Sequence, residues 1–448
     1  MNDHSTIAPS AHQRQDSNPL PPSQGAFASL AGPLQRAVSK EGYVTPTPIQ
    51  EECIPHLLTG RDLLGTAQTG TGKTAAFVLP MLQRLMHSNR KAVRGTPRAL
   101  VLAPTRELAA QIADSIRCYG RFTKLQHTVI FGGVSQYAQV KALNRGVDIV
   151  VATPGRLLDL VEQGHLRLGK VEILVLDEVD RMLDMGFIPD VKRITDMTMA
   201  QRQTLFFSAT MAPKVEEIAR SMVKDPVRVS ITPEKPAVEL ISQKVMFVGK
   251  HNKDALLVAV LRKTQADKVL VFTQMKHVAN RLAQTLADAG FRGTAIHGNK
   301  TQAARTRALD GFRNGRYQVL VATDVAARGL DVDNITHVIN YDLPLDAETY
   351  VHRIGRTARA GAGGDAISFC CEEDRSCLRA IERLLSAAVP ADLEHDFHCE
   401  KAVRSQMQMP RRGGSGGRPR RYNASGSRPP SRYGARGARG RRFARSGA

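Results

Sequence analysis

The clearest chemical signal in the chain is a glycine-rich turn that ends in Lys-Thr. It follows a short apolar run, opens a helical pattern and reads Ala67-Gln68-Thr69-Gly70-Thr71-Gly72-Lys73-Thr74. The backbone N–H groups of such a turn, together with the N-terminus of the next helix, bind phosphate oxygens. Lys73 is expected to neutralise the β- and γ-phosphates of a nucleotide, and the Thr74 hydroxyl to bind Mg²⁺. The turn therefore predicts a nucleotide site, although Ala67 stands where this pattern usually has glycine.

A run of three carboxylates is the second signal. Asp177-Glu178-Val179-Asp180 comes directly after an apolar strand pattern. A carboxylate at the carboxyl end of a parallel strand can face a phosphate-binding turn across the sheet. We therefore expect Asp177 to hold Mg²⁺ and Glu178 to orient and deprotonate an attacking water. Taken alone, the run fits a solvated turn equally well, but the preceding strand and the glycine-rich turn favour the catalytic interpretation.

Basic residues three positions apart form the third signal, in His352-Arg353-Ile354-Gly355-Arg356-Thr357-Ala358-Arg359. Phosphoryl transfer needs a positively charged group next to the γ-phosphate in the transition state, and a guanidinium supplies this charge as a planar fork. Because residues three apart share a helix face, Arg356 and Arg359 could stabilise that charge if the face meets the glycine-rich turn across an interdomain cleft. On spacing alone, a solvated basic face or a nucleic-acid patch is an equal alternative.

The elements that must position these residues alternate between strand and helix. Short apolar strands are expected at 62–67, 98–105, 148–153, 172–177 and 204–208, and again at 268–273, 294–297, 318–323, 337–341 and 366–370. Helical patterns lie between them, for example at 278–289 and 302–312. Strands that are apolar on both faces and separated by helices indicate parallel sheets. The fold class is therefore α/β, with domains at 26–230 and 241–388 joined by a linker at 231–240.

Charge is distributed unevenly along the chain. Its 448 residues carry 63 Lys and Arg against 42 Asp and Glu, a net charge of +21, and 14 of these positive charges lie in residues 401–448, which hold no acid. Residues 389–448 are therefore expected to form a basic, Arg/Gly-rich disordered tail, and the polar residues 1–25 a second tail. This balance favours a polyanionic partner, nucleic acid first. The chain shows no long apolar run and no secretory leader, so we expect no membrane span.

The three signals, in this order, resemble the DEAD-box family of RNA-dependent ATPases, and further motifs in family order extend the resemblance over residues 27–388. It implies two tandem RecA-like domains that bind nucleotide and RNA across the cleft between them, with ATP and Mg²⁺ as cofactors. It also implies that residues 27–55 read the adenine: Gln50 hydrogen-bonds its edge, Tyr43 stacks on it, and Phe27 is the upstream aromatic residue. Without the resemblance, this segment is typical of a Pro-rich turn and a helix start.

The resemblance assigns further roles residue by residue. Asp331 is expected to contact the nucleotide ribose. Asp180, the segment Ser208-Ala209-Thr210 and His352 are expected to couple hydrolysis to strand separation. Thr153, which precedes Pro154, is also a good helix N-cap. The RNA contacts, which would go to phosphates and 2′-hydroxyls with little base specificity, are expected from Pro104, Thr105, Arg106, Gly132, Gly133, Thr153, Arg156, Thr273, Arg305 and Thr323.

Three positions depart from the family pattern: Val179 stands where Ala is usual, Asn299 where Asp is usual, and Ala358 where Gly is common. The three carboxylates remain, so the chemistry is expected to survive, although the larger Val179 could crowd the packing. Ala358, the compact core and the Arg/Gly-rich tail resemble the bacterial RhlE-type subgroup.

The resemblance implies an ATP-dependent RNA helicase that unwinds RNA locally or remodels RNA–protein complexes. The six scattered cysteines, which include no CxxC pair, indicate a reduced, cytoplasmic protein. The charges of the tail, with the aromatic residues among them, suit a non-specific RNA tether. Proteins of RNA decay or ribosome assembly are candidate partners. Two alternatives stay open: an RNA clamp or annealing factor whose ATPase is weakened by Val179, and a DNA helicase. The alternative for the tail is a solubilising role.

Overall fold

The computed structural model describes residues 23–68, 70–88, 90–231, 241–327, 332, 334–357 and 363–405. Most of the expected amino-terminal tail, most of the linker and the end of the basic tail lie outside these ranges. The described residues form an amino-terminal and a carboxyl-terminal lobe, and each lobe is built around a sheet of its own.

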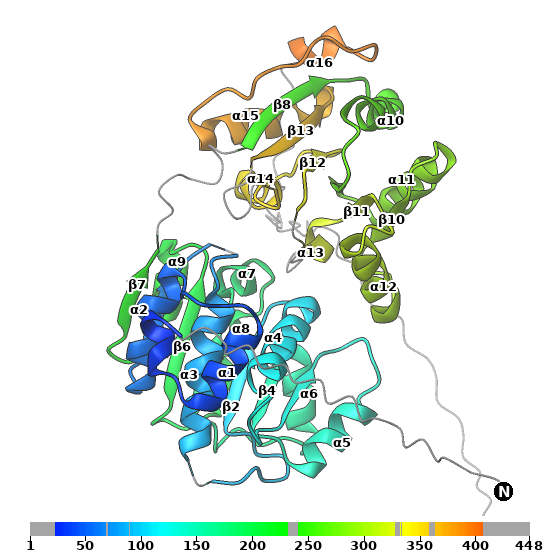
Figure 1. Ribbon diagram of the computed structural model, residues 1–448. Helices are drawn as coiled ribbons and strands as arrows, with labels where there is room; N and C mark the ends of the chain where they lie inside the picture. The colour runs from blue at the N-terminus through cyan, green and yellow to red at the C-terminus, as the bar shows by residue number, and fades with distance from the viewer. Residues whose placement is uncertain are drawn as a thin grey trace, which may run out of the picture. The chain divides into compact units, whose positions relative to one another are not determined.

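A seven-stranded parallel sheet forms the centre of the amino-terminal lobe (Figure 1). Its spatial order is β3 (His127–Ile130), β4 (Ile149–Ala152), β2 (Ala99–Leu102), β5 (Ile173–Leu176), β6 (Gln203–Ser208), β1 (Leu63–Thr66) and β7 (Val227–Ser230). All five strands predicted for this lobe are present. The two that were not predicted, β3 and β7, are the edge strands, and because each is partly exposed its sequence lacks a continuous apolar run.

Helices cover both faces of this sheet, because successive side chains of each strand point to opposite sides. In β2, for example, Ala99 and Val101 belong to one apolar core and Leu100 and Leu102 to the other. The first core also takes in α1 (Gly32–Lys40), α2 (Pro48–Leu58), α3 (Lys73–His87) and α4 (Arg106–Tyr119), preceded by the short η1 (Gly25–Ser29). The second takes in α5 (Tyr137–Arg145), α6 (Pro154–Glu162), α7 (Val179–Asp184), α8 (Ile188–Asp196) and α9 (Pro213–Met222).

The carboxyl-terminal lobe repeats this plan with six parallel strands. Their order is β10 (Gly293–Ile296), β11 (Val319–Ala322), β9 (Val269–Phe272), β12 (His337–Asn340), β13 (Gly364–Cys370) and β8 (Ile241–Phe247). The five predicted strands are present. The strand β8 was not predicted, because its first half contains the polar run Ser242-Gln243-Lys244 and it lies at the edge of the sheet. The helices are η3 (Lys250–Asn252), α10 (Lys253–Thr264), α11 (Lys276–Asp288), α12 (Gln302–Arg313), α13 (Asp324–Ala327), α14 (Ala347–Ile354), η5 (Glu372–Asp374), α15 (Arg375–Leu385) and α16 (Glu400–Arg404).

The expected start of the basic tail at residue 389 is wrong. Val245 of β8 donates its backbone N–H to the carbonyl of Pro390 at 2.9 Å, and Val248 forms an antiparallel bridge with His398. Val389 and Ala402 are buried in the same apolar cluster as β8. Residues 389–405 therefore belong to the carboxyl-terminal lobe, where apolar positions that are sparse in the sequence are gathered by packing against an edge strand.

Among the described residues, no helix combines the length and the apolar character needed to cross a bilayer.

Candidate nucleotide and RNA site

The predicted site residues of the amino-terminal lobe gather at one edge of its sheet. The strands are parallel, so every strand ends at the same edge. The glycine-rich turn follows β1, Asp177 follows β5 and Ser208 ends β6, in the half of the sheet that contains β1. The predicted RNA contacts follow β2, β3 and β4, in the other half. At one sheet edge, the nucleotide candidates thus follow β5, β6 and β1, and the RNA candidates follow β2, β3 and β4.

The glycine-rich turn has the backbone conformation that phosphate binding requires. Gly72, the N-cap of α3, and Gly70 both have positive φ, 93° and 88°, a region that residues with a Cβ rarely occupy. Lys73, the first residue of α3, is 6% exposed, and its ammonium donates to the carbonyl oxygen of Ala67. The Lys73 charge is therefore held inside the turn, next to the backbone that would receive the phosphates.

Gln50 and Thr47 tie α2 to this turn. The Gln50 Oε1 accepts from the Thr47 N–H at 2.9 Å, which completes a capping box at the start of α2. The Gln50 Nε2 donates to the carbonyl of Gly72 at 3.1 Å, and the Thr47 Oγ1 to that of Thr71 at 2.8 Å. Both ends of the Gln50 amide are thus used within the protein, so the predicted reading of adenine requires these bonds to be exchanged for bonds to the base.

The two aromatic residues assigned to the adenine differ in their exposure. Tyr43 is 45% exposed, with its ring centroid 6.4 Å from that of Tyr119. Phe27 is 1% exposed and lies in the apolar core among α1, α2 and α3. The Phe27 ring therefore packs in the core beneath η1, and its contact with the nucleotide stays a prediction. The sequence does not separate the two roles, since an aromatic residue serves either.

Asp177 and Glu178 are both buried at the end of β5, 2% and 3% exposed. Burial raises the pKa of Asp177 to about 7; the nearby Lys73 opposes this rise and Glu178 adds to it. The Asp177 Oδ1 is buried and has no hydrogen-bond partner among the described residues. A buried, unpaired carboxylate oxygen suits a hard divalent cation that prefers oxygen ligands, so these residues fit the Mg²⁺ that the sequence predicts.

Glu178 is held in a strained position. Its φ is 55°, in the left-handed region, at the N-cap of α7. Its Oε2 pairs with the Nη1 of Arg181 at 2.5 Å, and both side chains are buried. Non-glycine residues in this region cost roughly 1–3 kcal/mol and persist where the surroundings fix them, often at functional sites. The ion pair with Arg181 was not predicted; the i, i+3 spacing is its only sequence signal.

Asp180 connects α7 to the segment after β6. Its Oδ2 accepts from the backbone N–H groups of Ala209 and Thr210, both at 3.1 Å, and from the Thr210 hydroxyl at 3.4 Å. The Ser208 Oγ is buried and has no partner among the described residues. The third carboxylate of the run therefore binds the backbone of the predicted coupling segment and is not solvated. Val179, between Glu178 and Asp180, is fully buried in the second core. The two methyl groups that distinguish it from the usual alanine are therefore accommodated.

The predicted RNA contacts after β2 and β3 lie against each other. Thr105 caps α4, where its Oγ1 accepts from the N–H of Leu108 at 3.2 Å, and Pro104 is buried before it. Gly133 has a φ of 74°, and a Cβ there would meet the Arg106 guanidinium at 2.1 Å. Glycine at this position thus lets Arg106 pack onto the backbone, beside Gly132. Burial lowers the pKa of Arg106.

Thr153 and Arg156 lie at the start of α6. Thr153 is the N-cap and Pro154 follows it, as predicted, but the Thr153 side chain accepts no capping hydrogen bond. Arg156 pairs with Asp159 at 3.1 Å and donates to the carbonyl of Val134 at 3.4 Å. The second of these bonds joins the segment after β3 to the segment after β4.

The carboxyl-terminal lobe also places its RNA candidates at the carboxyl edge of its sheet. Thr273 follows β9 and Thr323 follows β11, and Arg305 is in the first turn of α12, which Thr301 caps. The Thr323 Oγ1 is buried without a partner among the described residues. The Thr273 Oγ1 instead donates to Asp342 at 2.7 Å. The two threonines thus share an edge, but only Thr273 has its hydroxyl engaged.

The arginine segment is not one continuous helix. The helix α14 ends at Ile354, so the prediction that Arg356 continues its face is wrong. Arg353, which had no predicted role, is 2% exposed and forms two bonds to Asp324, at 2.6 and 2.8 Å. Its Nη1 also donates to the carbonyl of Asp342 at 2.6 Å. Arg356, just past the helix, donates from its Nε to the carbonyl of His352 at 3.3 Å.

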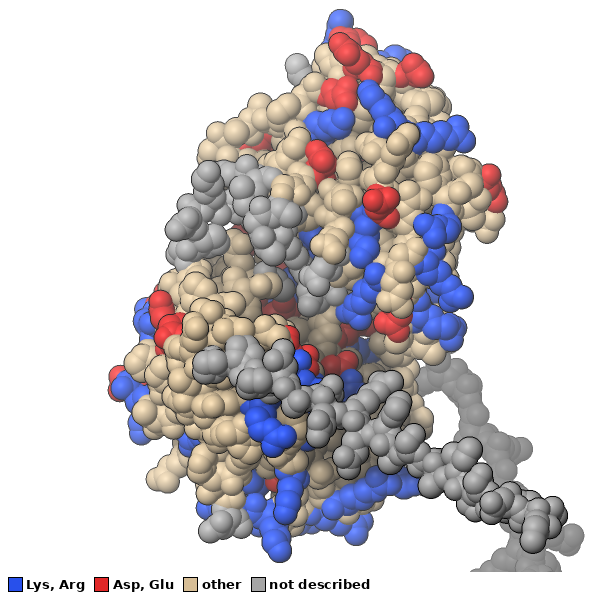
Figure 2. Space-filling model, viewed as in Figure 1, with Lys and Arg blue, Asp and Glu red and all other residues tan. Residues whose placement is uncertain are grey.

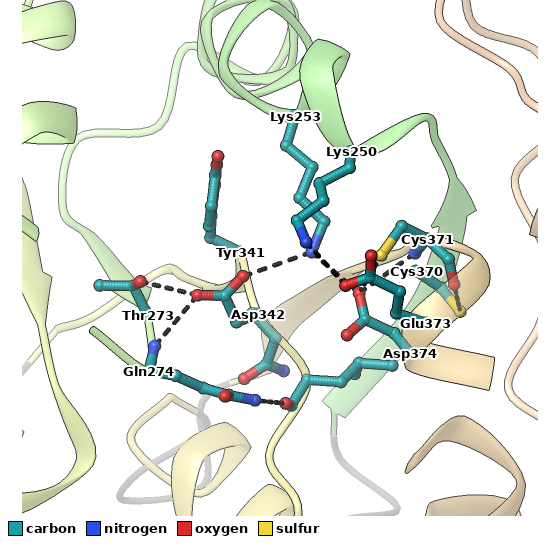
Figure 3. A network of polar contacts seen from close by, with 12 residues as sticks. Lys250, Lys253, Thr273, Gln274, Tyr341, Asp342, Cys370, Cys371, Glu373 and Asp374 are labelled. Atoms are coloured by element: carbon teal, nitrogen blue, oxygen red, sulfur yellow. Dashed lines mark hydrogen bonds and ion pairs between the residues drawn. The ribbon is translucent and has the colours of Figure 1, made fainter. Parts of the chain in front are cut away.

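A buried lysine extends this network (Figure 3). Lys253 opens α10, and its Nζ contacts the Asp374 Oδ2 at 2.9 Å and the Asp342 Oδ1 at 3.3 Å. The other oxygen of Asp342 accepts from the Thr273 hydroxyl and from the N–H of Gln274 at 3.0 Å. Asp342 therefore joins Lys253, the segment after β9 and Arg353. The sequence gives little signal for this, because its members come from five separate segments.

Thr69, Asp331 and Arg359 lie outside the described residues, and their predicted roles stay predictions.

Comparison with known proteins places the chain in a family. Residues 47–218 match the DEAD/DEAH box helicase family, and residues 252–361 match the helicase conserved C-terminal domain. The chain is 39% identical over 413 residues to proteins named ATP-dependent RNA helicase RhlB from Shewanella sp. strain W3-18-1 and Shewanella putrefaciens, which covers 89% of this chain and 94% of theirs. These relatives carry the name RhlB, so they do not support the predicted RhlE-type subgroup.

Solved structures of related proteins support the same family assignment. Saccharomyces cerevisiae Dbp5 bound to RNA and ADP BeF3 is 33% identical, with a TM-score of 0.71, over 81% of this chain and 94% of that one. Mss116 bound to single-stranded RNA and UDP-BeF is 28% identical, with a TM-score of 0.74, over 83% and 81%. The chain has two parallel-sheet lobes, and the amino-terminal sheet carries the acidic run and the glycine-rich turn at one edge. Together with relatives of this identity and coverage, these features show that the chain belongs to the DEAD-box branch of the DEAD/DEAH box helicases.

Proposed function

We propose that the protein is an ATP-dependent RNA helicase that couples ATP binding and hydrolysis to local separation of RNA strands or remodelling of RNA–protein complexes. The observation that carries this conclusion is the division of one sheet edge in the amino-terminal lobe. The glycine-rich turn and the acidic run occupy one half, and the RNA candidates occupy the other. Relatives named as RNA helicases, and related structures with bound RNA, support RNA as the substrate.

In the reaction, each side chain acts according to its position. Lys73 neutralises the phosphates that the glycine-rich turn binds. Asp177 and Thr74 would hold Mg²⁺, which when bound supplies positive charge to the phosphate oxygens. Glu178 orients the attacking water and takes its proton. Its Oε2 pairs with Arg181, so one carboxylate oxygen is fixed while the other is left to meet the water. Arg356 and Arg359 would stabilise the charge that develops on the transferred phosphate.

Coupling runs through Asp180 in this proposal. Three hydrogen bonds join its Oδ2 to Ala209 and Thr210, and its backbone lies two residues from Glu178. A change in the acidic run on hydrolysis therefore shifts the segment after β6. ATP and single-stranded RNA would together close the two lobes, and product release would reopen them. The cytoplasmic location and the protein partners stay predictions from the sequence.

The test is a comparison of ATPase rates with single-stranded RNA, structured RNA and DNA at two salt concentrations. We expect RNA to stimulate turnover and DNA not to. Equal stimulation by DNA would favour a DNA helicase, and no turnover with saturating RNA would favour an RNA clamp.

A companion variant tests the assignment of the base. Glu178→Gln keeps the size of the side chain and removes its basicity, so it should retain ATP-dependent RNA binding and lose turnover, by roughly 100-fold or more for a general base. Turnover at the wild-type rate would refute the role of Glu178.

A further inference from the structure

Three segments at the opposite edge of the amino-terminal sheet, where the strands begin, carry unpaired positive charge. They are residues 90–98, between α3 and β2; residues 141–148, from α5 to the start of β4; and residues 165–172, before β5. Together they hold eight Lys or Arg and two acids, a net charge of 8 − 2 = +6. Residues 1–400 as a whole have 49 basic and 42 acidic residues, a net charge of +7. The net charge of these three segments is therefore nearly as large as that of all the residues before the basic tail.

Both acids in the segments are already paired. Asp148 pairs with Arg98, and Glu172 pairs with Arg98 and Arg90. Six exposed basic side chains remain, none with an ion pair to the described residues. We call them the amino-edge patch: Lys91, Arg94, Lys141, Arg145, Arg167 and Lys170. Basic side chains also line the lower border of the amino-terminal lobe in Figure 2.

The backbone that presents the patch is fixed. Gly95, in the turn closed by the bridge between Val93 and Thr96, donates its N–H to the carbonyl of Leu143 at 3.0 Å and accepts from the N–H of Arg167 at 2.8 Å. Its φ is 63°, and a Cβ there would meet the carbonyl of His165 at 2.8 Å. Only glycine lets this turn pack between the end of α5 and the segment before β5. The three segments are therefore held together as one surface.

The charge of Arg94 is oriented without being neutralised by the described residues. The Nε of Arg94 donates to the side-chain oxygen of Asn144 at 3.0 Å. An amide partner orients the guanidinium but leaves its charge in place. Lys141 and Arg145 are four residues apart on α5 and so share one helix face. A fixed cationic surface of this kind attracts polyanions and gains affinity when it releases their counterions.

Resting on the proposed function, we propose that the amino-edge patch is a second RNA-binding surface, which takes the phosphate backbone of a duplex that flanks the strand bound at the carboxyl edge. Its composition favours a duplex. Binding of single strands combines basic residues with aromatic side chains on which bases stack, and the three segments contain no Phe, Tyr or Trp. Duplex RNA is recognised through its phosphates and shape, for which lysine and arginine are sufficient. The patch would anchor structured RNA while the opposite edge acts on a nearby strand.

The test uses the full chain and two triple variants that remove the same charge. The patch variant is Arg94→Gln, Arg145→Gln and Arg167→Gln. The control variant is Lys40→Gln, Lys192→Gln and Lys224→Gln, three exposed lysines on other parts of the lobe that form no ion pair with the described residues. The affinity of each protein is measured for two RNA probes. One is a short single strand, and the other is the same strand joined to a hairpin of roughly 16 base pairs, enough to span two minor grooves. The basic tail is present throughout, so its contribution is common to all.

We expect the patch variant to bind the hairpin probe more weakly than the control variant does. The slope of log binding constant against log salt concentration should be smaller in magnitude by about 2–3, close to 0.9 per lost phosphate contact. Affinity for the short strand, and the ATPase that it stimulates, should be alike in both. Equal hairpin binding by the two variants would overturn the proposal, as would an equal loss with both probes. Absence of RNA-stimulated ATPase in the wild type would instead contradict the proposed function itself.

Discussion

Replacement of Lys253 by methionine is the sharpest test of the network in the carboxyl-terminal lobe, because the chain carries its own control. Lys253 and Lys250 lie three residues apart, and each contacts a carboxylate of η5, Asp374 at 2.9 Å and Glu373 at 2.7 Å (Figure 3). The Lys253 side chain is 4% exposed and that of Lys250 is 71% exposed. The two ion pairs are thus similar in length and differ in burial.

Burial decides the magnitude. Removing one partner of a buried ion pair costs about 3–5 kcal/mol, because it leaves an uncompensated charge in the protein. In Lys253→Met this charge is shared by Asp342 and Asp374. An exposed pair such as that of Lys250 contributes about 0–1 kcal/mol. For a domain of 150–250 residues each kcal/mol shifts the Tm by roughly 2–4 °C. We therefore expect Lys253→Met to lower the Tm of this lobe by roughly 6–20 °C and Lys250→Met by at most about 4 °C.

The pH dependence has a definite sign. Burial by itself lowers the pKa of Lys253, but the carboxylates of Asp374 and Asp342 outweigh it and raise the pKa above its ordinary value of 10.5. A group whose pKa rises on folding stabilises the protein fully below its unfolded pKa, and this stability declines as the pH rises through the folded value. The difference between wild type and Lys253→Met should thus be constant from neutral pH to about pH 10.5 and shrink above it.

Differential scanning calorimetry of the full chain is the suitable assay, because the sequence contains no tryptophan. Lys253→Met should also weaken RNA binding, since Asp342 fixes Thr273 and Gln274 after β9. Equal Tm losses for the two lysine variants would refute the reasoning, because they would show that burial of the pair does not govern its contribution.

Two other regions give direct predictions. Gly72→Ala should lower the Tm of the nucleotide-free protein more than Gly70→Ala, because both glycines have positive φ but only a Cβ at Gly72 meets Gln50, at 2.4 Å; equal losses would indicate that backbone strain alone matters. Truncation at Pro410 should weaken RNA binding at low salt and spare the basal ATPase, because counterion release by the tail's arginines is lost; unchanged affinity would leave the tail a solubilising role.

Local sequence was sufficient to predict the strands at the centre of each sheet. Strands such as β2 and β5 are buried on both faces, so their residues form a continuous apolar run. Three of the four edge strands, β3, β7 and β8, were not predicted, because partial exposure mixes polar residues into each. The structured residues 389–405 were not predicted either, because their order comes from packing against β8.

For the candidate site, the sequence alone determined the glycine-rich turn, the acidic run and their place after strands, because these depend on local backbone geometry and on residue type. Tertiary structure decided what each side chain contacts. It buried Phe27 in the core, used both ends of the Gln50 amide and ended α14 before Arg356. It also brought Lys253, Thr273 and Asp342 together. Spacing along a chain does not encode contacts between distant segments, because these depend on how strands and helices pack in the folded protein.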